Sequence, residues 1–476
     1  MSKKTYEMVI GLEVHVELKT KTKIFCACPT AFGAAPNTQC CPVCAGMPGV
    51  LPVLNKKVVE YAIKAGLATH CGIATYSKND RKNYFYPDLP KAYQISQYDL
   101  PLCEGGYVDI TTEEGEKRIG ITRIHIEEDA GKLLHDAGHG TLIDLNRCGV
   151  PLIEIVSEPD MRSAKEAVAY LKKLRSIVLY TDISDAKMNE GSLRCDVNIS
   201  VREKGAESFG VRAEIKNINS FAFVAKAIEY EFRRQVTALE AGKPIVQETR
   251  RFDPATGKTN SMRSKENAND YRYFPDPDLL PIRTDAQTLA RIAASIPPLP
   301  DTRRRKYMDQ FGLSPYHSER LALNRALSDF FEQAAEFTAY KQILASFLLS
   351  EVSRLMNGEE ESEIAAKPAQ LATLADMLGT GRINGGGAKK LIGALWGTEA
   401  DPADLVSQLG LAQVNDRDTL FGLARRAVQE NPDMVADYRS GKQAALKAIM
   451  GWAMAAAKGK ANPELLQECL LNELGH

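Results

Sequence analysis

Strict alternation of apolar and polar side chains constrains this chain more than any other feature. Between Ile10 and Leu18 every second residue is apolar, and Glu13, His15 and Glu17 stand between the apolar ones. A period of two puts apolar side chains on one face of a β-strand and polar ones on the other. The polar face is either an ordinary solvent-facing surface or a surface that binds a ligand. The same alternation recurs at residues 121–128 and 193–201, and a strand-like run spans residues 152–157.

Acidic side chains gather around the loop that joins two of these segments. Glu127 and Glu128 end the segment 121–128, and Glu154 lies in the segment 152–157. Two acid-bearing strands joined by a loop can converge on a hard cation, because Mg²⁺ takes oxygen ligands. Solvated loop carboxylates are the alternative for each acid taken singly. With the first strand, the set favours an antiparallel sheet that has one packed face and one working face.

Four of the ten cysteines have the spacing of a metal site. A close pair is followed by a short loop and a C-x-x-C motif, which is a zinc-knuckle arrangement. Four thiolates can close a tetrahedral Zn²⁺ shell, and a closed shell makes the metal structural. Buried free thiols are the alternative, and Cys40 is a spare. The predicted ligands are Cys26, Cys28, Cys41 and Cys44.

A loop rich in Lys, Arg and Tyr spans residues 78–94 and is stiffened by Pro87 and Pro90. Its side chains can bind phosphate or donate hydrogen bonds to an anion, whereas a packed aromatic loop with solvated lysines is the alternative. Further polar candidates lie on the outward face of the strand 193–201 and in the stretch that follows it. The candidate phosphate- or substrate-binding residues are Lys82, Tyr84, Lys91, Tyr93, Arg194, Asp196, Asn198, Lys216, Asn217, Asn219 and Ser220.

The composition is that of an ordinary soluble globular protein of 476 residues, with 44% hydrophobic and 25% charged residues. The formal net charge of −1 predicts no bulk attraction to a polyanion, so any nucleic-acid surface must be a local patch. We expect no signal peptide and no membrane span, because no long apolar run is present. The cysteine pattern suits a reducing compartment, so we expect a cytoplasmic protein.

Two changes along the sequence predict three domains. Alternation gives way to helices rich in Ala, Leu, Glu and Lys after Asp301, and Asp401 with Pro402 indicates a second boundary. The predicted domains are 1–295, 296–402 and 403–476. Basic side chains on helices of the last domain form either an RNA-facing patch or a solvated surface. These are Arg425, Arg426, Arg439, Lys442, Lys447, Lys458 and Lys460.

Motifs along essentially the whole chain resemble one family, the B subunits of the glutamyl-tRNA(Gln)/aspartyl-tRNA(Asn) amidotransferase (GatCAB). The C-terminal stretch is similar to the YqeY-like tail of that family. So many long motifs make a chance match very unlikely. The motifs are IGLEVHVEL, CPVCAGMPGVLPVLN, DRKNYFYPDLPKAYQIS, RIHIEEDAGK, DLNRCGVPLIEIVSEPD, EGSLRCDVNIS, KNINSF and MGWAMAAAKGKANPELL.

The resemblance implies a cradle-shaped catalytic domain, a helical domain and a tail that contacts tRNA. It implies an ATP-dependent carbon–nitrogen ligase that takes its amide nitrogen from glutamine. The side-chain carboxylate of misacylated Glu-tRNA(Gln) and/or Asp-tRNA(Asn) is phosphorylated and then attacked by ammonia. The ammonia comes from the glutaminase (A) subunit, and a small C subunit completes the enzyme.

The resemblance also implies roles for particular residues. The family's metal-binding positions match Glu13, His15, Glu128 and Glu154, with Glu127 adjacent. A histidine ligand is less typical of Mg²⁺ and admits Mn²⁺ as the alternative. Lys82 and Glu128 are candidates to pass ammonia along or to take its proton. The cysteine pairs match the zinc knuckle that some family members carry and others lack.

The chemistry is consistent with the residues available. Phosphoryl transfer depends mostly on positioning and charge neutralisation, so Mg²⁺ held by acids and assisted by lysines is sufficient. The chain has no Gly-Ser-rich stretch of the kind that an amidase needs for its serine nucleophile, which argues for a partner that supplies ammonia. The rival hypotheses are a non-catalytic RNA-binding subunit with a zinc knuckle and a two-metal nuclease.

Overall fold

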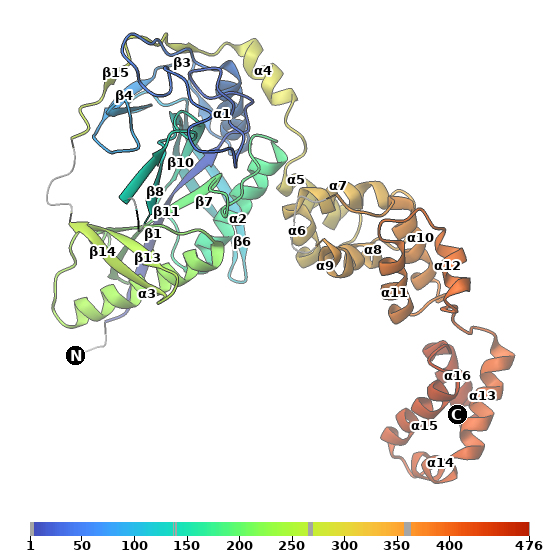
Figure 1. Cartoon of the computed structure of the whole chain (residues 1–476). Helices are drawn as coiled ribbons and strands as arrows, with labels where there is room; N and C mark the ends of the chain where they lie inside the picture. Colours follow the sequence, from blue (N-terminus) through green and yellow to red (C-terminus); the bar gives the residue numbers. More distant parts are fainter. Residues whose placement is uncertain (1–3, 137, 139, 265–269, 357–362, 476) are drawn as a thin grey trace. The chain divides into compact units, whose positions relative to one another are not determined.

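A nine-stranded sheet organises the first part of the protein in a computed structural model (Figure 1). The structure describes residues 4–136, 138, 140–264, 270–356 and 363–475. Two compact units are present, Met1–Leu299 and Pro300–His476. All the predicted strand segments lie in the first unit.

The order of the strands in this sheet is β14-β13-β12-β11-β1-β10-β7-β6-β2, and only the β12–β13 pairing is parallel. The prediction of an α+β fold with a mainly antiparallel sheet is therefore confirmed. The strands are β1 (Tyr6–Glu17), β2 (Gly72–Ile73), β6 (Cys103–Thr112), β7 (Gly115–Glu128), β10 (Pro151–Ser157), β11 (Leu193–Glu203), β12 (Ala213–Lys216), β13 (Glu248–Asp253) and β14 (Lys258–Ser264).

One face of the sheet is packed by three helices, α1 (Lys56–Ala68), α2 (Ala164–Tyr180) and α3 (Phe221–Glu240). The apolar side chains of β1, among them Leu12 and Val14, are buried in the same core as Val58 of α1 and Tyr170 of α2. The polar side chains of β1 alternate with these residues and therefore point to the opposite face. This second face is called the working face below.

Capping interactions fix where the helices of this core begin. The backbone N–H of Glu166 donates to Ser163 Oγ at 3.1 Å, and the Glu166 carboxylate accepts from the backbone N–H of Arg162 at 2.6 Å. Ser220 caps α3 in the same way, by accepting from the backbone N–H of Phe223 at 3.2 Å. Each cap satisfies a backbone donor that would otherwise lack a partner at the helix end.

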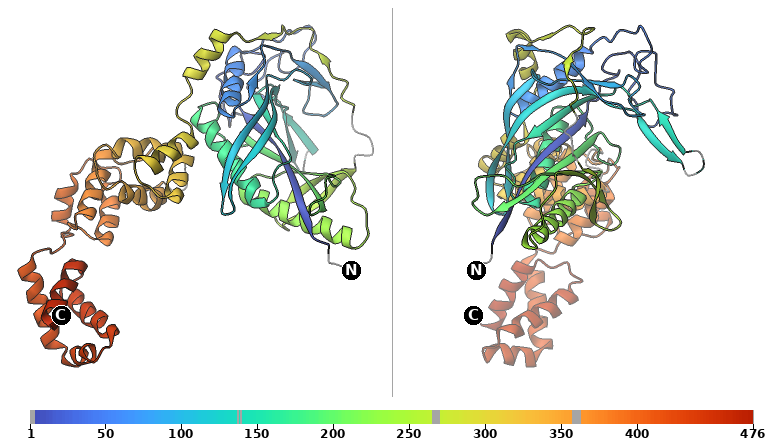
Figure 2. Two further views of the ribbon diagram at one scale, coloured as in Figure 1. Left: turned by 180° about the vertical axis from the view of Figure 1, so that it is seen from behind. Right: turned by 90° about the vertical axis from the view of Figure 1, so that its left-hand side faces the viewer.

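Three small sheets complete the first unit. The strand order β15-β4-β5 forms one, and the pairs β16–β3 and β8–β9 form the others. The hairpin β8–β9 extends away from the nine-stranded sheet (Figure 2). The elements are β3 (Tyr76–Ser77), β4 (Asp80–Asn83), β5 (Tyr93–Ser96), β8 (Lys132–Asp136), β9 (Gly140–Asp144), β15 (Phe274–Pro275), β16 (Ile282–Arg283) and α4 (Ala286–Ala294).

In the described part of the second unit, the regular secondary structure consists of helices, apart from one isolated bridge between Val414 and Ala461. It contains two separate apolar clusters. The helices are α5 (Pro300–Asp309), α6 (Pro315–Leu323), α7 (Arg325–Ala334), α8 (Lys341–Phe347), η1 (Leu348–Val352), α9 (Ser353–Leu355), α10 (Pro368–Gly379), α11 (Gly385–Leu395), α12 (Pro402–Gln408), α13 (Arg417–Glu430), α14 (Pro432–Arg439), α15 (Gln443–Ala456) and α16 (Pro463–Leu474).

The residues around the predicted boundary at 402 belong to a helix. Asp401 caps α12 by accepting from the backbone N–H of Ala403 at 2.7 Å, and Val406 of α12 is buried in the first apolar cluster. The second cluster begins at Leu420. The first cluster thus continues past residue 402, and the predicted domain limits stay predictions. None of the helices among the described residues is long and apolar enough to cross a bilayer.

Candidate active site

Cross-strand pairing aligns the polar side chains of four strands in a row across the working face. His15 of β1 lies opposite Glu154 of β10 on one side and Arg194 of β11 on the other. Glu154 in turn lies opposite His125 of β7. Directly opposed residues have Cβ atoms about 5 Å apart, so the side chains of this row touch. Register therefore brings together residues that are far apart in the sequence.

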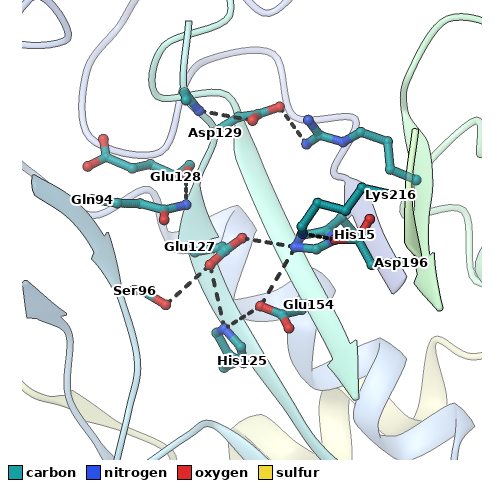
Figure 3. Close-up of polar contacts among 12 residues, drawn as sticks. His15, Gln94, Ser96, His125, Glu127, Glu128, Asp129, Glu154, Asp196 and Lys216 are labelled. Atoms are coloured by element: carbon teal, nitrogen blue, oxygen red, sulfur yellow. Dashed lines mark hydrogen bonds and ion pairs between the residues drawn. The ribbon is translucent and has the colours of Figure 1, made fainter. Parts of the chain in front are cut away.

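The centre of this row is a group of two histidines and two glutamates, which we call the His–Glu cluster: His15, His125, Glu127 and Glu154. His15 Nε2 lies 3.7 Å from Glu127 Oε1 and 3.7 Å from Glu154 Oε2. His125 Nε2 lies 3.6 Å from Glu127 Oε2 and 3.2 Å from Glu154 Oε2 (Figure 3). Ser96 of β5 donates to Glu127 Oε2 at 3.3 Å. Ligand atoms of His15, Glu127 and Glu154 all lie within 4.8 Å of one another, so these three residues could hold a metal ion.

The charges of the His–Glu cluster stabilise one another in a buried setting. Burial alone would raise the pKa of Glu127 and Glu154, but hydrogen bonds and charge from His125 lower both pKa values. Burial also opposes protonation of His125, yet Glu127 and Glu154 outweigh it and raise its pKa to about 9. Two ionised carboxylates therefore lie on the working face, and a divalent cation binds to oxygen ligands of this kind.

A second group of acids lies next to this cluster on β1, β11 and β12. Carboxylate oxygens of Glu13, Asp196 and Glu214 lie within 4.8 Å of one another. Lys216 forms ion pairs with Asp196 and with Glu214, the latter at 2.9 Å, and Asn198 Nδ2 donates to Glu13 Oε1 at 2.9 Å. Burial and the charge of Glu154 raise the pKa of Glu13. Much of the charge of this group is therefore already balanced by Lys216.

Glu128 of the predicted metal set Glu13, His15, Glu128 and Glu154 does not lie with either group. Consecutive residues of a strand point to opposite faces, so Glu128 turns away from Glu127 (Figure 3). Its carboxylate forms an ion pair with Lys91 and accepts from the backbone N–H of Ile95 at 2.8 Å. Among the predicted acids, the structure brings Glu127 rather than Glu128 to His15 and Glu154.

Lys82 lies at the border of the His–Glu cluster and is surrounded by tyrosines. Its Nζ atom lies 4.9 Å from the ring centre of Tyr271 and 5.7 Å from that of Tyr84. Its charge is also one of the factors that lower the pKa of Glu154. The Tyr84 hydroxyl donates to Gln94 Oε1 at 3.3 Å. Lys82 and Tyr84, both predicted site residues, therefore lie beside the cluster.

The other predicted binding residues divide between the working face and supporting roles. Arg194 donates to Asp129 Oδ2 at 2.7 Å. Lys91 lies 5.2 Å from the ring centre of Tyr93, on the side of β7 that carries Glu128. Asn217, with a φ of 66°, donates to the carbonyl oxygen of Phe252 at 3.2 Å. Ser220 is a helix cap, and Asn219 is exposed. The segment 217–220 thus shapes a loop and a helix end.

The predicted zinc ligands come together. Sulfur atoms of Cys26, Cys28, Cys41 and Cys44 lie within 4.8 Å of one another, which is compatible with a bound metal such as zinc. A hydrogen bond from Cys26 lowers the pKa of Cys44 to about 4, and the charge of Lys23 contributes. Cys40 instead points its thiol at the carbonyl oxygen of Asn37, at 3.3 Å.

Two residues of the site were missed by sequence reasoning. His125 and Arg123 lie on the polar face of the alternating segment 121–128, and no role was predicted for them from the sequence. Tyr271 and Tyr273 were not missed, because they lie in the stretch 270–278, whose side chains are expected from the sequence to be able to line a cleft; Tyr271 contacts Lys82. The available signal for His125 and Arg123 was the phase of the alternation, because both share their face with Glu127.

Comparison with known proteins agrees with the resemblance drawn from the motifs. A model of the GatB/GatE catalytic domain matches residues 8–290, and a model of the GatB domain matches residues 329–474. Curated relatives named as the B subunit of aspartyl/glutamyl-tRNA(Asn/Gln) amidotransferase are 54% identical in Caldicellulosiruptor bescii, 53% in Geotalea daltonii and 51% in Carboxydothermus hydrogenoformans. Each alignment covers 98% of this chain and 99% of the relative.

Proposed function

Because the chain belongs to the GatB family, the B subunits of tRNA-dependent amidotransferases, we propose that it activates the misacylated amino acid on tRNA. It uses ATP to phosphorylate the side-chain carboxylate of Glu-tRNA(Gln) and/or Asp-tRNA(Asn). Ammonia from a glutaminase subunit then replaces the phosphate, which gives Gln-tRNA(Gln) and/or Asn-tRNA(Asn). The observation that carries this proposal is the buried His–Glu cluster on the working face.

The activation step explains why a kinase-like site is needed. A carboxylate resists attack by ammonia because oxide is a poor leaving group, whereas phosphate is a good one. The donor set of His15, Glu127 and Glu154 fits Mg²⁺, with Mn²⁺ as the alternative because one donor is an imidazole. A bound divalent cation would neutralise charge on the transferring phosphoryl group.

The residues of the chain set up this step in three ways. Glu127 and Glu154 present negative charge at a fixed place, because His125 and Ser96 hold their carboxylates. Lys82 lies beside the cluster and is placed to contact phosphate oxygens. The acids Glu13 and Asp196 lie next to the cluster, but Lys216 already balances Asp196. We therefore assign the cation to the His–Glu cluster.

The proton that leaves ammonia needs an acceptor near the acyl group. Of the pair expected to handle ammonia, Lys82 borders the His–Glu cluster, whereas Glu128 is held by Lys91 on the opposite side of β7. We keep Lys82 as a residue that helps to pass ammonia along, and we give Glu128 a structural role. The ion pair fixes the end of β7, and thereby the position of Glu127.

The remaining parts of the proposal concern partners and place. The chain works with a glutaminase (A) subunit and a small C subunit, and the domain 403–476 contacts the tRNA. A structural Zn²⁺ in the four-cysteine group would tie together the segment that precedes α1. Since the proposed substrates belong to translation, we place the protein in the cytoplasm.

The division of labour can be tested with purified components. The chain alone should release no glutamate from glutamine. The assembled enzyme should hydrolyse ATP only when Mg²⁺ and misacylated tRNA are both present. ATP hydrolysis at the same rate with and without misacylated tRNA would contradict the proposal. Full amidation activity in the absence of this chain would also contradict it, because it would show that the chain is not catalytic. Cleavage of the tRNA itself would instead identify a nuclease.

A further inference from the structure

Arg123 lies on the working face, close to the His–Glu cluster. It lies on β7 two residues before His125, opposite Val156 of β10, which in turn lies opposite Glu13 of β1. Its side chain is half-buried. Its Nε atom lies 3.4 Å from His125 Nδ1, but a protonated His125 has no lone pair on that nitrogen to accept a hydrogen bond. Arg123 therefore borders both the His–Glu cluster and the neighbouring acids.

The charge of Arg123 has no carboxylate partner within ion-pair distance among the residues that the structure describes. Other cations of the same face already form ion pairs. Arg194 pairs with Asp129, and Lys216 pairs with Asp196 and Glu214. A guanidinium presents five N–H donors, and a half-buried one normally has most of them bonded. The contact with His125 involves the Nε atom, and the outer fork of the guanidinium has no partner among the residues that the structure describes.

Lys82 also has no anionic partner among the described residues. No ion pair or hydrogen bond of its ammonium group is found in the described residues, and its contacts are the rings of Tyr84 and Tyr271. Two cations without an ion-pair partner among the described residues thus lie beside a buried pair of carboxylates. The ring of Tyr273 lies 6.0 Å from the ring of Tyr271, which contacts Lys82. A ligand with several anionic oxygens would satisfy both cations.

We propose that Arg123 binds the phosphoryl group that is transferred, together with Lys82 on the other side. This inference rests on the proposed function and adds a residue to it. In the transfer, a carboxylate oxygen of the aminoacyl side chain bonds to the γ-phosphorus of ATP, and the bond from that phosphorus to the bridging oxygen breaks. ADP leaves with that electron pair, and Arg123 keeps its protons throughout.

The planar fork explains why an arginine stands at this position. Two parallel N–H groups match two oxygens of a phosphoryl group, which an ammonium group cannot do. During amidation, the bond between the acyl carbon and the phosphate oxygen breaks, and phosphate leaves with the electron pair. Arg123 would hold that phosphate as well, so it contributes to both steps.

A binding experiment tests the proposal without turnover. Arg123→Gln should weaken binding of a non-hydrolysable ATP analogue to the assembled enzyme by about 10- to 100-fold, the usual effect of removing a charge-assisted hydrogen bond. Equilibrium dialysis in Mg²⁺ measures this. Arg118→Gln is the matched control, because Arg118 lies on the same strand but pairs with Asp109 at 2.8 Å on the exposed surface. Equal affinities of the two variants would overturn the proposal.

A kinetic experiment separates a phosphate contact from a structural role. Arg123→Gln should lower tRNA-dependent ATP turnover by about 100-fold or more, and Arg123→Lys should lose less because it keeps the charge. Added guanidinium ion should restore part of the turnover of Arg123→Ala. Glutamine hydrolysis should stay within about twofold of the parent enzyme, which shows that the subunits still assemble.

The outcomes also separate this inference from the proposed function. If the parent enzyme shows no tRNA-dependent ATP turnover, the proposed function fails. If the parent enzyme turns over ATP and Arg123→Gln keeps at least half of that rate, only the role of Arg123 fails. Loss of turnover without guanidinium rescue, in a variant that also melts at a lower temperature, would assign Arg123 to folding and overturn its role at phosphate.

Discussion

Glu127 and Glu128 are adjacent in the sequence, yet their carboxylates lie on opposite sides of β7. Glu127 faces His15 and His125, whereas Glu128 faces Lys91. Exchanging each for glutamine keeps the shape of the side chain and removes its charge. The two variants therefore distinguish a residue that binds a cation from one that holds the strand.

We expect Glu127→Gln to raise the Mg²⁺ concentration needed for half-maximal ATP turnover by at least about tenfold. The fold should survive, because glutamine can still accept a hydrogen bond from Ser96. A Mg²⁺ titration of tRNA-dependent ATP turnover measures the change. If the titration curve of Glu127→Gln matches that of the parent enzyme, Glu127 does not hold the cation.

Glu128→Gln should behave in the opposite way. Lys91 would lose its ion-pair partner while only 12% of its side chain is exposed, and glutamine would keep just the contact with the backbone N–H of Ile95. Breaking a buried ion pair costs on the order of 3 kcal/mol. We therefore expect a clear loss of stability in denaturant titrations and little change in Mg²⁺ dependence. A large shift in Mg²⁺ dependence would restore Glu128 to the cation site.

This pair of glutamates also shows what could be predicted about single residues. The alternation of the segment 121–128 places Glu127 on the same face as His125, which the structure confirms. The resemblance matches Glu128 to a metal position of the family, whereas period-two geometry groups Glu127 with His125 and puts Glu128 on the other face. Contacts such as those of His15 with Glu127 were beyond prediction, because they depend on which strands are neighbours in the sheet.

At the scale of elements, helix α1 approaches the sheet at a glycine. A Cβ atom added to Gly66 would lie 2.6 Å from Cys103 Sγ of β6 and 2.7 Å from Ile73 Cδ1. Overpacking of this kind costs about 1–3 kcal/mol, which exceeds the gain of about 1 kcal/mol when alanine replaces glycine in a helix. We expect Gly66→Ala to reduce the protection of α1 in hydrogen-exchange measurements.

Gly451 provides the matched control for this prediction. It lies within α15, is exposed, and has no neighbour within 4 Å of an added Cβ atom. Gly451→Ala should therefore gain helix propensity alone and increase protection of α15 by about 0.5–1 kcal/mol. The two substitutions are chemically identical and should have opposite signs. A gain in protection at both positions would show that α1 can move away from the sheet at little cost.

The positions of strands and helices along the sequence were easier to predict than which strands pair with one another. Helix α1 begins at Lys56, because Asn55 caps its first turn by accepting from the backbone N–H of Lys57. The strand expected at Ile10–Leu18 begins earlier, at Tyr6, because β11 pairs along its whole length. Placing β1 between β10 and β11 required long-range pairing, and a local pattern carries no information about that choice.

At the scale of the whole molecule, the four-cysteine group should stabilise more than its own loop. Asn37 donates its backbone N–H to Asp144 at 3.0 Å, Gln39 donates to Asn146 at 2.8 Å, and Lys23 donates to the carbonyl oxygen of Leu145 at 3.4 Å. Removing the metal with a chelator should therefore increase hydrogen exchange at residues 143–149 as well as at 23–50. The unit Pro300–His476 should show no change.

Two cysteine variants give this prediction its control. Cys44→Ser should lose most of the bound zinc, because Cys44 is one of the four clustered thiols, whereas Cys40→Ser should retain it. Metal content per chain and exchange at residues 143–149 should change together. Exchange that rises without loss of metal would separate the loop from the zinc site.

The predicted C-terminal domain, residues 403–476, gives a testable expectation about tRNA. Three exposed cations, Arg439, Lys447 and Lys458, form no ion pair within the described residues of this domain. When cations without an ion-pair partner neutralise phosphates of the tRNA, the counterions of those phosphates are released. Binding of the tRNA should therefore weaken steeply as the salt concentration rises. Replacing all three by glutamine should lower affinity and reduce the slope of log affinity against log salt by about 0.7–0.9 for each phosphate that is no longer neutralised.

The matched control removes the same amount of charge from cations that already have partners. Arg417, Arg425 and Lys442 form ion pairs with Glu468 at 3.0 Å, Glu473 at 3.1 Å and Asp437 at 2.8 Å. Their replacement by glutamine should change the salt slope much less, since exposed ion pairs contribute little and their charges are already balanced. Filter binding across a salt series compares the two triple variants. Equal slopes would mean that net charge alone governs the contact, and a salt-independent affinity in the parent enzyme would place the tRNA elsewhere on the chain.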